Sequence, residues 1–289
     1  MSELILDCFL DALKDGALSI PILFIAYFLM ELLERSRRLD ESILHAYSRK
    51  TGPLIGGLLG VVPQCGISGA AATLFSTGAI TVGTMLAVFF ATSDEMLPVM
   101  LSSLTDENAI SAGRILGIVA SKAALAVVLG YLTDLLARGF FKRKDIHSFC
   151  EREHCSCEEE EGSALRAAWV HTLKIAGMLI AVTFALNLIL ANVEPSQLEG
   201  TVLSRPVSGA LLLALLGLIP NCSVSVILTQ AFLSGVIGLG GLYAGLLSNA
   251  GIGLLVLFRT NRDLRENLVV TGIAYVLAAL CGALIGVLF

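Results

Sequence analysis

The chain has 289 residues, of which 56% are hydrophobic and only 15% are charged, and its mean hydropathy is +0.84. This apolar share is well above that of a soluble globular domain and excludes that class. The formal net charge of −5 says little about partners, because insertion into lipid governs such a chain. We expect a lipid bilayer around it and no nucleic-acid partner.

Charged residues fall between long apolar runs, which is the pattern of an all-α polytopic membrane protein. In chain order, four runs have the length of a single membrane span, and two longer apolar blocks lie among them. The predicted spans are residues 16–34, 110–136, 167–190 and 268–289, and the blocks are residues 52–104 and 206–258.

The two blocks carry the same motif. LLGVVPQCGISG at residues 58–69 reappears as LLGLIPNCSVSV at residues 215–226, an offset of 157 positions (215 − 58). The matches at this offset are Pro63, Cys65, Ser68, Phe75, Gly78, Ile80, Gly83 and Ala87 with Pro220, Cys222, Ser225, Phe232, Gly235, Ile237, Gly240 and Ala244. Duplicated interruptions of apolar segments are the best pointer in a sequence to a transporter's substrate site.

Basic residues set the predicted orientation, because Lys and Arg concentrate in cytoplasmic loops. They put three segments inside: the loop after the first span, the central linker and the loop before the last span. These residues are Arg35, Arg37, Arg38, Arg49, Lys50, Arg138, Lys142, Arg143, Lys144, Arg259, Arg262 and Arg265. Residues 105–111, residues 192–205 and both termini are poor in basic residues, so we expect them outside.

This orientation requires each long block to cross the membrane an odd number of times. About 50 helical residues reach about 75 Å, against about 90 Å for three full crossings. We therefore expect one full span and one re-entrant or broken helical hairpin per block, with the Pro-amide-Cys motif at the hairpin tip near mid-membrane. Two halves with odd numbers of crossings are inverted repeats. The predicted domains are residues 1–138 and 166–289, joined by a cytosolic linker at residues 139–165.

Each hairpin tip combines a helix breaker with polar ligands. Proline lacks an amide donor and frees carbonyl groups in the preceding turn. The candidate ligands are Gln64, Cys65 and Ser68 in the first copy and Asn221, Cys222, Ser223 and Ser225 in the second. The alternative is that proline only kinks a helix and small residues only allow close packing. Duplication with the cysteine and the carboxamide kept favours a substrate or ion site.

A polar quartet, Thr92-Ser93-Asp94-Glu95, lies near the middle of the next apolar run. Intramembrane acids are costly and usually functional. Because adjacent helix positions diverge by about 100°, we expect one acid to face the site while the other meets a partner. The equivalent stretch of the second block is polar at Ser248 and Asn249 but uncharged, so we predict an asymmetric site with the negative charge in the first half. The alternative is that the acids lie at the outer surface.

Lys122 lies about one third of the way into the predicted span 110–136. A buried lysine needs a carboxylate partner to stay charged, and Asp94 or Glu95 is the natural candidate. We therefore predict that Lys122 and these two acids form the coupling group. The alternative is that its ammonium reaches out to the membrane interface.

The central linker is rich in soft-metal ligands. Three cysteines and two histidines fall within eleven residues and precede the acidic residues 158–161. The five candidate ligands are His147, Cys150, His154, Cys155 and Cys157. Such a set suits a transition metal, and a cytosolic position keeps the thiols reduced. The alternative is a flexible charged linker that binds nothing.

The paired PQCG and PNC motifs, carried by Pro63, Gln64, Cys65, Pro220, Asn221 and Cys222, resemble a prokaryotic family described as ten-transmembrane heavy-metal exporters. Its members are often labelled manganese transporters and are related in name to arsenical permeases. The resemblance implies an exporter in the prokaryotic inner membrane. Ten segments agree with six spans and four half-helices.

The leading hypothesis is therefore a secondary transporter that exports a divalent metal such as manganese, exchanged for protons at the intramembrane acids. The alternative keeps the fold and changes the cargo to an organic or oxyanion solute, such as an organoarsenical or an amphipathic acid. No P-loop motif is present, and no HExxH or GxSxG motif suggests an enzyme. We expect no cofactor beyond a transported or regulatory metal, and a homodimer is a candidate assembly.

Overall fold

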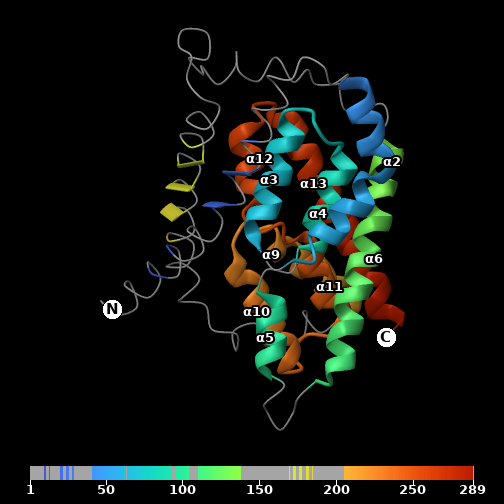
Figure 1. Cartoon of the computed structure of the whole chain (residues 1–289). Coiled ribbons are helices and arrows are strands. Elements are labelled where there is room, and N and C mark those ends of the chain that lie inside the picture. Colours follow the sequence, from blue (N-terminus) through green and yellow to red (C-terminus); the bar gives the residue numbers. More distant parts are fainter. Residues whose placement is uncertain are drawn as a thin grey trace.

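The computed structural model describes residues 41–62, 64–92, 95–103, 110–137 and 205–288, with scattered helical positions among residues 10–28 and 169–184. Regular structure in these described residues is helical. Figure 1 shows α2 (Glu41–Leu59), α3 (Cys65–Ser76), α4 (Val82–Ala91), α5 (Met96–Ser102), α6 (Ala112–Leu136), α9 (Pro206–Gly217), α10 (Cys222–Leu233), α11 (Leu239–Ser248), α12 (Gly253–Thr260) and α13 (Leu264–Leu288).

Four helical segments of the described residues are long and apolar enough to cross a membrane. Two are the single helices α6 and α13, of 25 residues each, which agree with the predicted spans 110–136 and 268–289. The other two, Val82–Ser102 and Leu239–Thr260, each combine two shorter helices. The all-α membrane class is thereby confirmed. The predicted spans 16–34 and 167–190 lie mostly outside the described residues.

The sequence repeat is also a repeat of helices. α3 and α10 have 12 residues each and start 157 positions apart (222 − 65), and α4 and α11 have 10 residues each at the same offset (239 − 82). α5 and α12 also start 157 positions apart (253 − 96). α6 and α13 have equal lengths, but their starts are 152 positions apart (264 − 112). The loop between the last two helices of the second run is therefore shorter.

Glycine at a left-handed backbone angle ends α3 and α10. Gly78 has φ of 85° and Gly235 has φ of 76°, a region that costs other residues energy. The following amide then bonds back into the last turn, from Ala79 N to Leu74 O at 2.9 Å and from Val236 N to Ala231 O at 2.9 Å. This turn reverses the chain in the same way in both runs.

Small residues set the register of the long helices against the central ones. A Cβ atom added to Gly130 of α6 would lie 2.7 Å from the carbonyl oxygen of Gly83 in α4. A Cβ atom added to Gly282 of α13 would lie 2.6 Å from the carbonyl oxygen of Gly240 in α11. Such close backbone approach is how helices associate in lipid. Because Gly282 follows Gly130 by 152 positions, the crossing independently supports the equivalence of α6 and α13.

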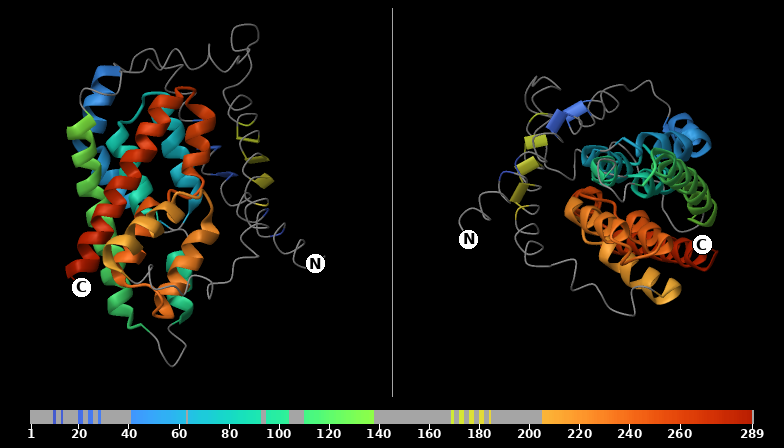
Figure 2. Two further views of the ribbon diagram at one scale, coloured as in Figure 1. Left: turned by 180° about the vertical axis from the view of Figure 1, so that it is seen from behind. Right: turned by 90° about the horizontal axis from the view of Figure 1, so that it is seen from below.

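The two runs exchange contacts with each other. α3 packs against α12, and α10 packs against α5, while α4 and α11 meet between them. In Figure 1, α3 and α12 lie toward the upper end and α10 and α5 toward the lower end. Figure 2, seen from below, shows the two runs side by side.

The interrupted helices form the centre and the long ones the periphery. The segment Leu239–Thr260 is 89% buried and Val82–Ser102 is 69% buried, against 33% for α6 and 28% for α13. Large apolar side chains on the outer faces, such as Leu116 and Leu284, are 70% and 63% exposed and are suited to contact lipid. The interruptions are therefore enclosed by protein.

Candidate functional site

In both halves, one glycine brings the Pro-amide-Cys segment, called the tip below, against the end of an interrupted span. A Cβ atom added to Gly60, three residues before Pro63, would lie 2.7 Å from the Val88 carbonyl oxygen and from Ala91 Cβ. At the equivalent Gly217 it would overlap Ser248 Oγ and the Gly245 carbonyl. Only glycine permits this approach. Each tip therefore lies beside the break that follows α4 or α11.

The tips begin helices as the sequence predicts. Gln64 and Asn221 are the N-cap residues of α3 and α10 and both have extended backbone. The Asn221 side chain accepts a hydrogen bond from Ser223 N at 2.9 Å, as an N-cap does. Pro63 and the Cys65 side chain lie outside the description, and Cys65 is the first residue of α3.

The second tip is closed to solvent. Asn221, Cys222 and Ser225 are buried, and Ser223 is half-buried. Ser225 Oγ donates to the Cys222 carbonyl at 2.6 Å, within its own helix. On the first tip, Ser68 is also buried and Gln64 is half-buried. The candidate ligands of the tips whose side chains the structure describes are thus at least partly shielded.

The central spans are interrupted where the sequence analysis assumed a continuous helix. α4 ends at Ala91 and α5 begins at Met96, so the expectation that neighbouring acids diverge by a helical angle does not apply. Thr92 is a buried C-cap whose Oγ1 donates to Val88 O at 2.7 Å. Glu95 is a half-buried N-cap of α5. Ser93 and Asp94 lie outside the described residues.

The equivalent break in the second half joins α11 to α12. Asn249 is its C-cap, at the position equivalent to Thr92 (249 − 92 = 157), and its side chain is 4% exposed. Its Oδ1 accepts a hydrogen bond from Gly251 N at 2.9 Å. Gly251 has φ of 53°, which favours glycine. The polar quartet and the Ser-Asn-Ala-Gly stretch were the sequence signals for these two breaks.

Lys122 is buried, with a side chain 1% exposed. Its ammonium donates a hydrogen bond to the carbonyl oxygen of Thr92, at the C-terminal end of α4. A cation is favoured at that end by the helix dipole. The offset of α6 and α13 makes Ala274 the counterpart of Lys122 (122 + 152), so the second half lacks this cation.

The two halves therefore differ in charge at equivalent positions. The first half has an acid pair at Asp94 and Glu95 and a buried lysine, and the second half has Gly251, Ile252 and Ala274. The predicted asymmetry extends to the lysine. Sequence reasoning missed the difference at Lys122, because α13 follows α6 by 152 positions whereas the motif repeats after 157.

Ser121, the residue next to Lys122, connects α6 to the other half. Its hydroxyl is hydrogen-bonded to Tyr243 of α11, which also donates to the Ile118 carbonyl at 3.2 Å. α6 thus contacts both interrupted spans at neighbouring residues. The sequence offered no signal for this contact, since neither residue belongs to a motif.

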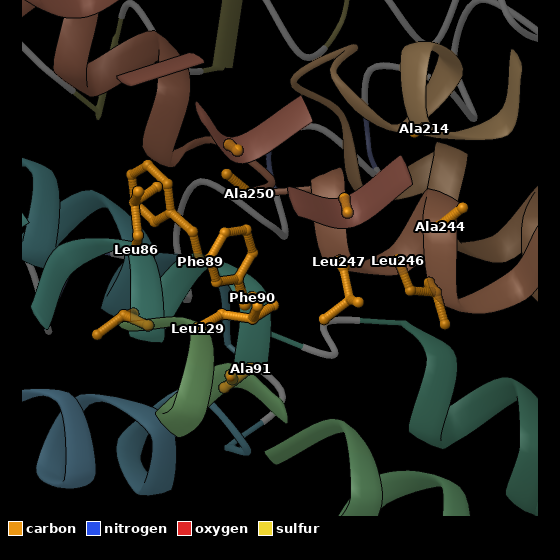
Figure 3. Close-up of a cluster of buried hydrophobic side chains, with 14 of the residues drawn as sticks. Leu86, Phe89, Phe90, Ala91, Leu129, Ala214, Ala244, Leu246, Leu247 and Ala250 are labelled. Atoms are coloured by element: carbon orange, nitrogen blue, oxygen red, sulfur yellow. The ribbon is translucent and has the colours of Figure 1, made fainter. Parts of the chain in front are cut away.

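The ends of α4 and α11 pack on each other through apolar side chains. Figure 3 shows Phe89 and Phe90 of α4 gathered with Leu246 and Leu247 of α11 and with Ala250 of the break. The start of α12 fits against this cluster because Gly253 has no side chain. A Cβ atom there would lie 2.7 Å from Phe89 Cε1 and 2.9 Å from Ser68 Cβ.

Ser68 also shows that α3 and α12 run parallel. It lies against the first residue of α12, and at the other ends Ser76 Oγ and Thr260 Oγ1 are 2.8 Å apart. Both helices therefore present their N-terminal ends to the region of the breaks. Helix N-terminal ends carry partial positive charge.

The predicted linker ligands, from His147 to Cys157, lie outside the described residues. Among the residues that the structure does describe, no three His, Cys, Asp or Glu side chains form a group that could hold a metal ion. The described polar groups at the breaks and tips are amides, hydroxyls, a thiol, the Glu95 carboxyl group and backbone carbonyls.

A family model described as "Putative, 10TM heavy-metal exporter" matches residues 2–201. The chain belongs to this family. The match covers the first motif, the acid pair, Lys122 and the linker, and it ends before the second motif. No curated protein and no solved structure matches the chain. Family membership and the apolar helices identify a multi-pass membrane protein of an exporter family, with the lipid bilayer and a heavy metal as its partners.

Proposed function

We propose that this protein is a secondary exporter that moves a heavy metal by alternating access between two inverted repeats. The reciprocal packing of α3 on α12 and of α10 on α5 supports this, because exchanged contacts are the mark of a two-fold relation. The equivalent helices α3 and α10 lie toward opposite ends in Figure 1, as a two-fold axis in the membrane plane requires. Inverted repeats of this kind alternate around a fixed central site.

One observation carries the proposal: in both halves, Gly60 or Gly217 holds a Pro-amide-Cys tip against the break of a central span. Irregular backbone at membrane depth is tolerated only where it is buried in protein or lines a cavity. The cargo would bind between these tips and breaks. Its proposed ligands are Gln64, Cys65, Ser68, Thr92, Ser93, Asn221, Cys222, Ser223, Ser225 and Asn249.

The proposed orientation puts the central linker in the cytoplasm of a prokaryotic cell and both termini outside its inner membrane. Exposed Arg259, Arg262 and Arg265 at the α12–α13 connection support it. The upper end of Figure 1, where α12 joins α13, would be cytoplasmic. In this position the linker cysteines and histidines would bind the metal before export or regulate its export.

In its cation form, the proposal is export of a divalent ion such as manganese in exchange for protons. Asp94 and Glu95 would bind the metal when deprotonated and a proton when the metal has left. Lys122, buried beside Thr92, would balance their charge between the two states. This version rests on the acids, which are hard oxygen ligands suited to Mn²⁺.

The second candidate cargo is an organic or oxyanion solute. The parallel arrangement of α3 and α12 favours it, because two helix N-termini face the same region. Such ends attract negative charge. Both forms use the same fold and the same breaks.

The proposal is tested by efflux from cells that lack their own exporters, loaded in turn with Mn²⁺, Co²⁺, Zn²⁺, Cd²⁺ or arsenite. We expect Cys222→Ser to lower efflux of the cargo at least about tenfold, the effect of losing about 1.4 kcal/mol of binding. Cys281→Ser is the matched control, since it alters a half-buried cysteine in the peripheral helix α13. Glu95→Gln should abolish proton-driven efflux of a divalent ion. Equal efflux by wild type and Cys222→Ser for every cargo would contradict the proposed site.

A further inference from the structure

Asn249 carries hydrogen-bond donors that the protein does not use. Its side chain is 4% exposed, and Oδ1 accepts from Gly251 N at 2.9 Å. An amide nitrogen cannot accept from a backbone N–H, so this bond fixes which end of the amide is oxygen. In the described part of the chain, the two hydrogens on Nδ2 have no acceptor within hydrogen-bond distance.

Two other buried amides, at the connection between α12 and α13, do use their hydrogen-bond donors. Asn261 Nδ2 donates to Glu266 Oε2 and to Asn267 Oδ1, both at 2.7 Å. Asn267 Nδ2 donates to the Asn261 carbonyl at 2.7 Å. Buried polar groups in proteins nearly always have a partner, and one without a partner calls for a ligand or a bound water. Asn249 is therefore set apart from comparable amides in the same chain.

The side chains next to Asn249 in the sequence offer it no free acceptor. Its neighbour Ser248 donates its hydroxyl to the Ala244 and Gly245 carbonyls, both at 3.0 Å. The other neighbours are Ala250, Gly251 and Ile252, which are buried and carry no polar side-chain atom. The N-terminal end of α12, eight residues long, follows at once and adds partial positive charge. Apart from the backbone carbonyls at the end of α11, the break thus offers hydrogen-bond donors and no side-chain ligand for a bare cation.

The first half is arranged in the opposite way. Thr92, the counterpart of Asn249, donates its hydroxyl to Val88 O within its own helix. Its carbonyl accepts from Lys122. At this pair of equivalent residues, therefore, the free donor belongs to the second half.

We propose that Asn249 donates a hydrogen bond to an oxygen atom of the cargo, so that the metal crosses as an oxygen-bearing species, an oxyanion or its protonated acid. This inference rests on the proposed exporter function and chooses between its two cargo forms. Asn249 is then the residue that selects the chemical form. A bare divalent cation would be repelled by the N–H groups that face it.

The test uses the full-length protein in inside-out proteoliposomes, with uptake of arsenite, chromate and Mn²⁺ measured separately. Asn249→Asp keeps an oxygen to accept from Gly251 N and replaces the NH₂ donor with oxygen. Asn249→Thr copies the first half, where the hydroxyl bonds to its own helix, and serves if the aspartate variant does not fold. Gln230→Glu, on an exposed side chain of α10, controls for an added carboxyl group.

We expect wild type and Gln230→Glu to take up arsenite or chromate, and both Asn249 variants to lose about tenfold or more of that uptake, the effect of losing one hydrogen bond to the cargo. Mn²⁺ uptake by wild type that both Asn249 variants retain would overturn the inference and leave the exporter proposal standing. Oxyanion uptake that both variants retain would also overturn it. If wild type takes up none of the probes and Cys222→Ser shows no efflux defect, the exporter proposal itself fails.

Discussion

At the residue scale, equivalent buried positions in the two halves carry side chains of different size. Phe89 packs against Gly253, and the positions equivalent to these two are Leu246 and Met96. A phenylalanine ring and a glycine at the first two positions correspond to a leucine and a methionine at the second two. All four residues are buried, so a change in the volume of any of them affects its neighbours.

This exchange predicts the effect of adding one methyl group. Gly253→Ala would put a Cβ atom 2.7 Å from Phe89 Cε1, and overpacking of a buried site costs about 1–3 kcal/mol. We expect a lower unfolding temperature in detergent. Phe89→Leu, which copies Leu246, should restore most of the loss in the double variant. A double variant less stable than Gly253→Ala alone would show that the added methyl group overlaps with a residue other than Phe89.

At the element scale, α4 is capped by a side chain from another helix. Asp134 of α6 accepts from Gly83 N at 2.8 Å and from Thr81 Oγ1 at 2.7 Å. A carboxylate at a helix N-terminus forms charge-assisted hydrogen bonds and is favoured by the dipole. The equivalent residue in α13 is Gly286 (134 + 152), so the second half lacks this cap. The cap fixes the cytoplasm-facing end of α4 in the proposed orientation.

We expect Asp134→Asn to destabilise the protein by about 1–2 kcal/mol, because the charged acceptor is lost and one of its two oxygens becomes an amide donor. The measurement is the free energy of unfolding in mild detergent. Thr81→Ala should lower the free energy of unfolding by less in the Asp134→Asn protein than in the wild type, since both residues belong to one network. Additive losses would show that Asp134 acts independently of the Thr81 cap.

How far the sequence predicts these elements depends on the kind of signal. The tips were predictable because proline and a carboxamide interrupt an apolar run at Gln64 and Asn221, and both residues do begin helices. The second pair was not predicted as helix ends, since the polar stretches at Thr92 and Asn249 contain no proline. Tertiary contacts end α4 there, among them the close approach of Gly60 to Val88 and Ala91. Sequence periodicity contains no information on such contacts.

At the scale of the whole molecule, inversion makes a sharp prediction about sidedness. Ser102 at the end of α5 and Arg259 in the last turn of α12 are equivalent (259 − 102 = 157), and both are exposed. Inverted repeats put them on opposite faces of the membrane. We expect Ser102→Cys to react with an impermeant thiol reagent in intact cells and Arg259→Cys to react only after the cells are opened. Labelling of both variants from the same side would exclude inversion. Wild-type protein treated with the same reagent controls for reaction of the native thiols.

The charge difference between the halves has a consequence for the resting state. If two halves with identical sequences exchanged conformations, the inward-open and outward-open states would have equal free energy. Lys122 and the acid pair in one half, against Ala274, Gly251 and Ile252 in the other, remove that equality. A difference of about 1.4 kcal/mol already makes one state ten times more populated. Without cargo, the transporter would therefore rest mainly in one state, open to one side of the membrane. The same few residues that contact the cargo would determine which side that is.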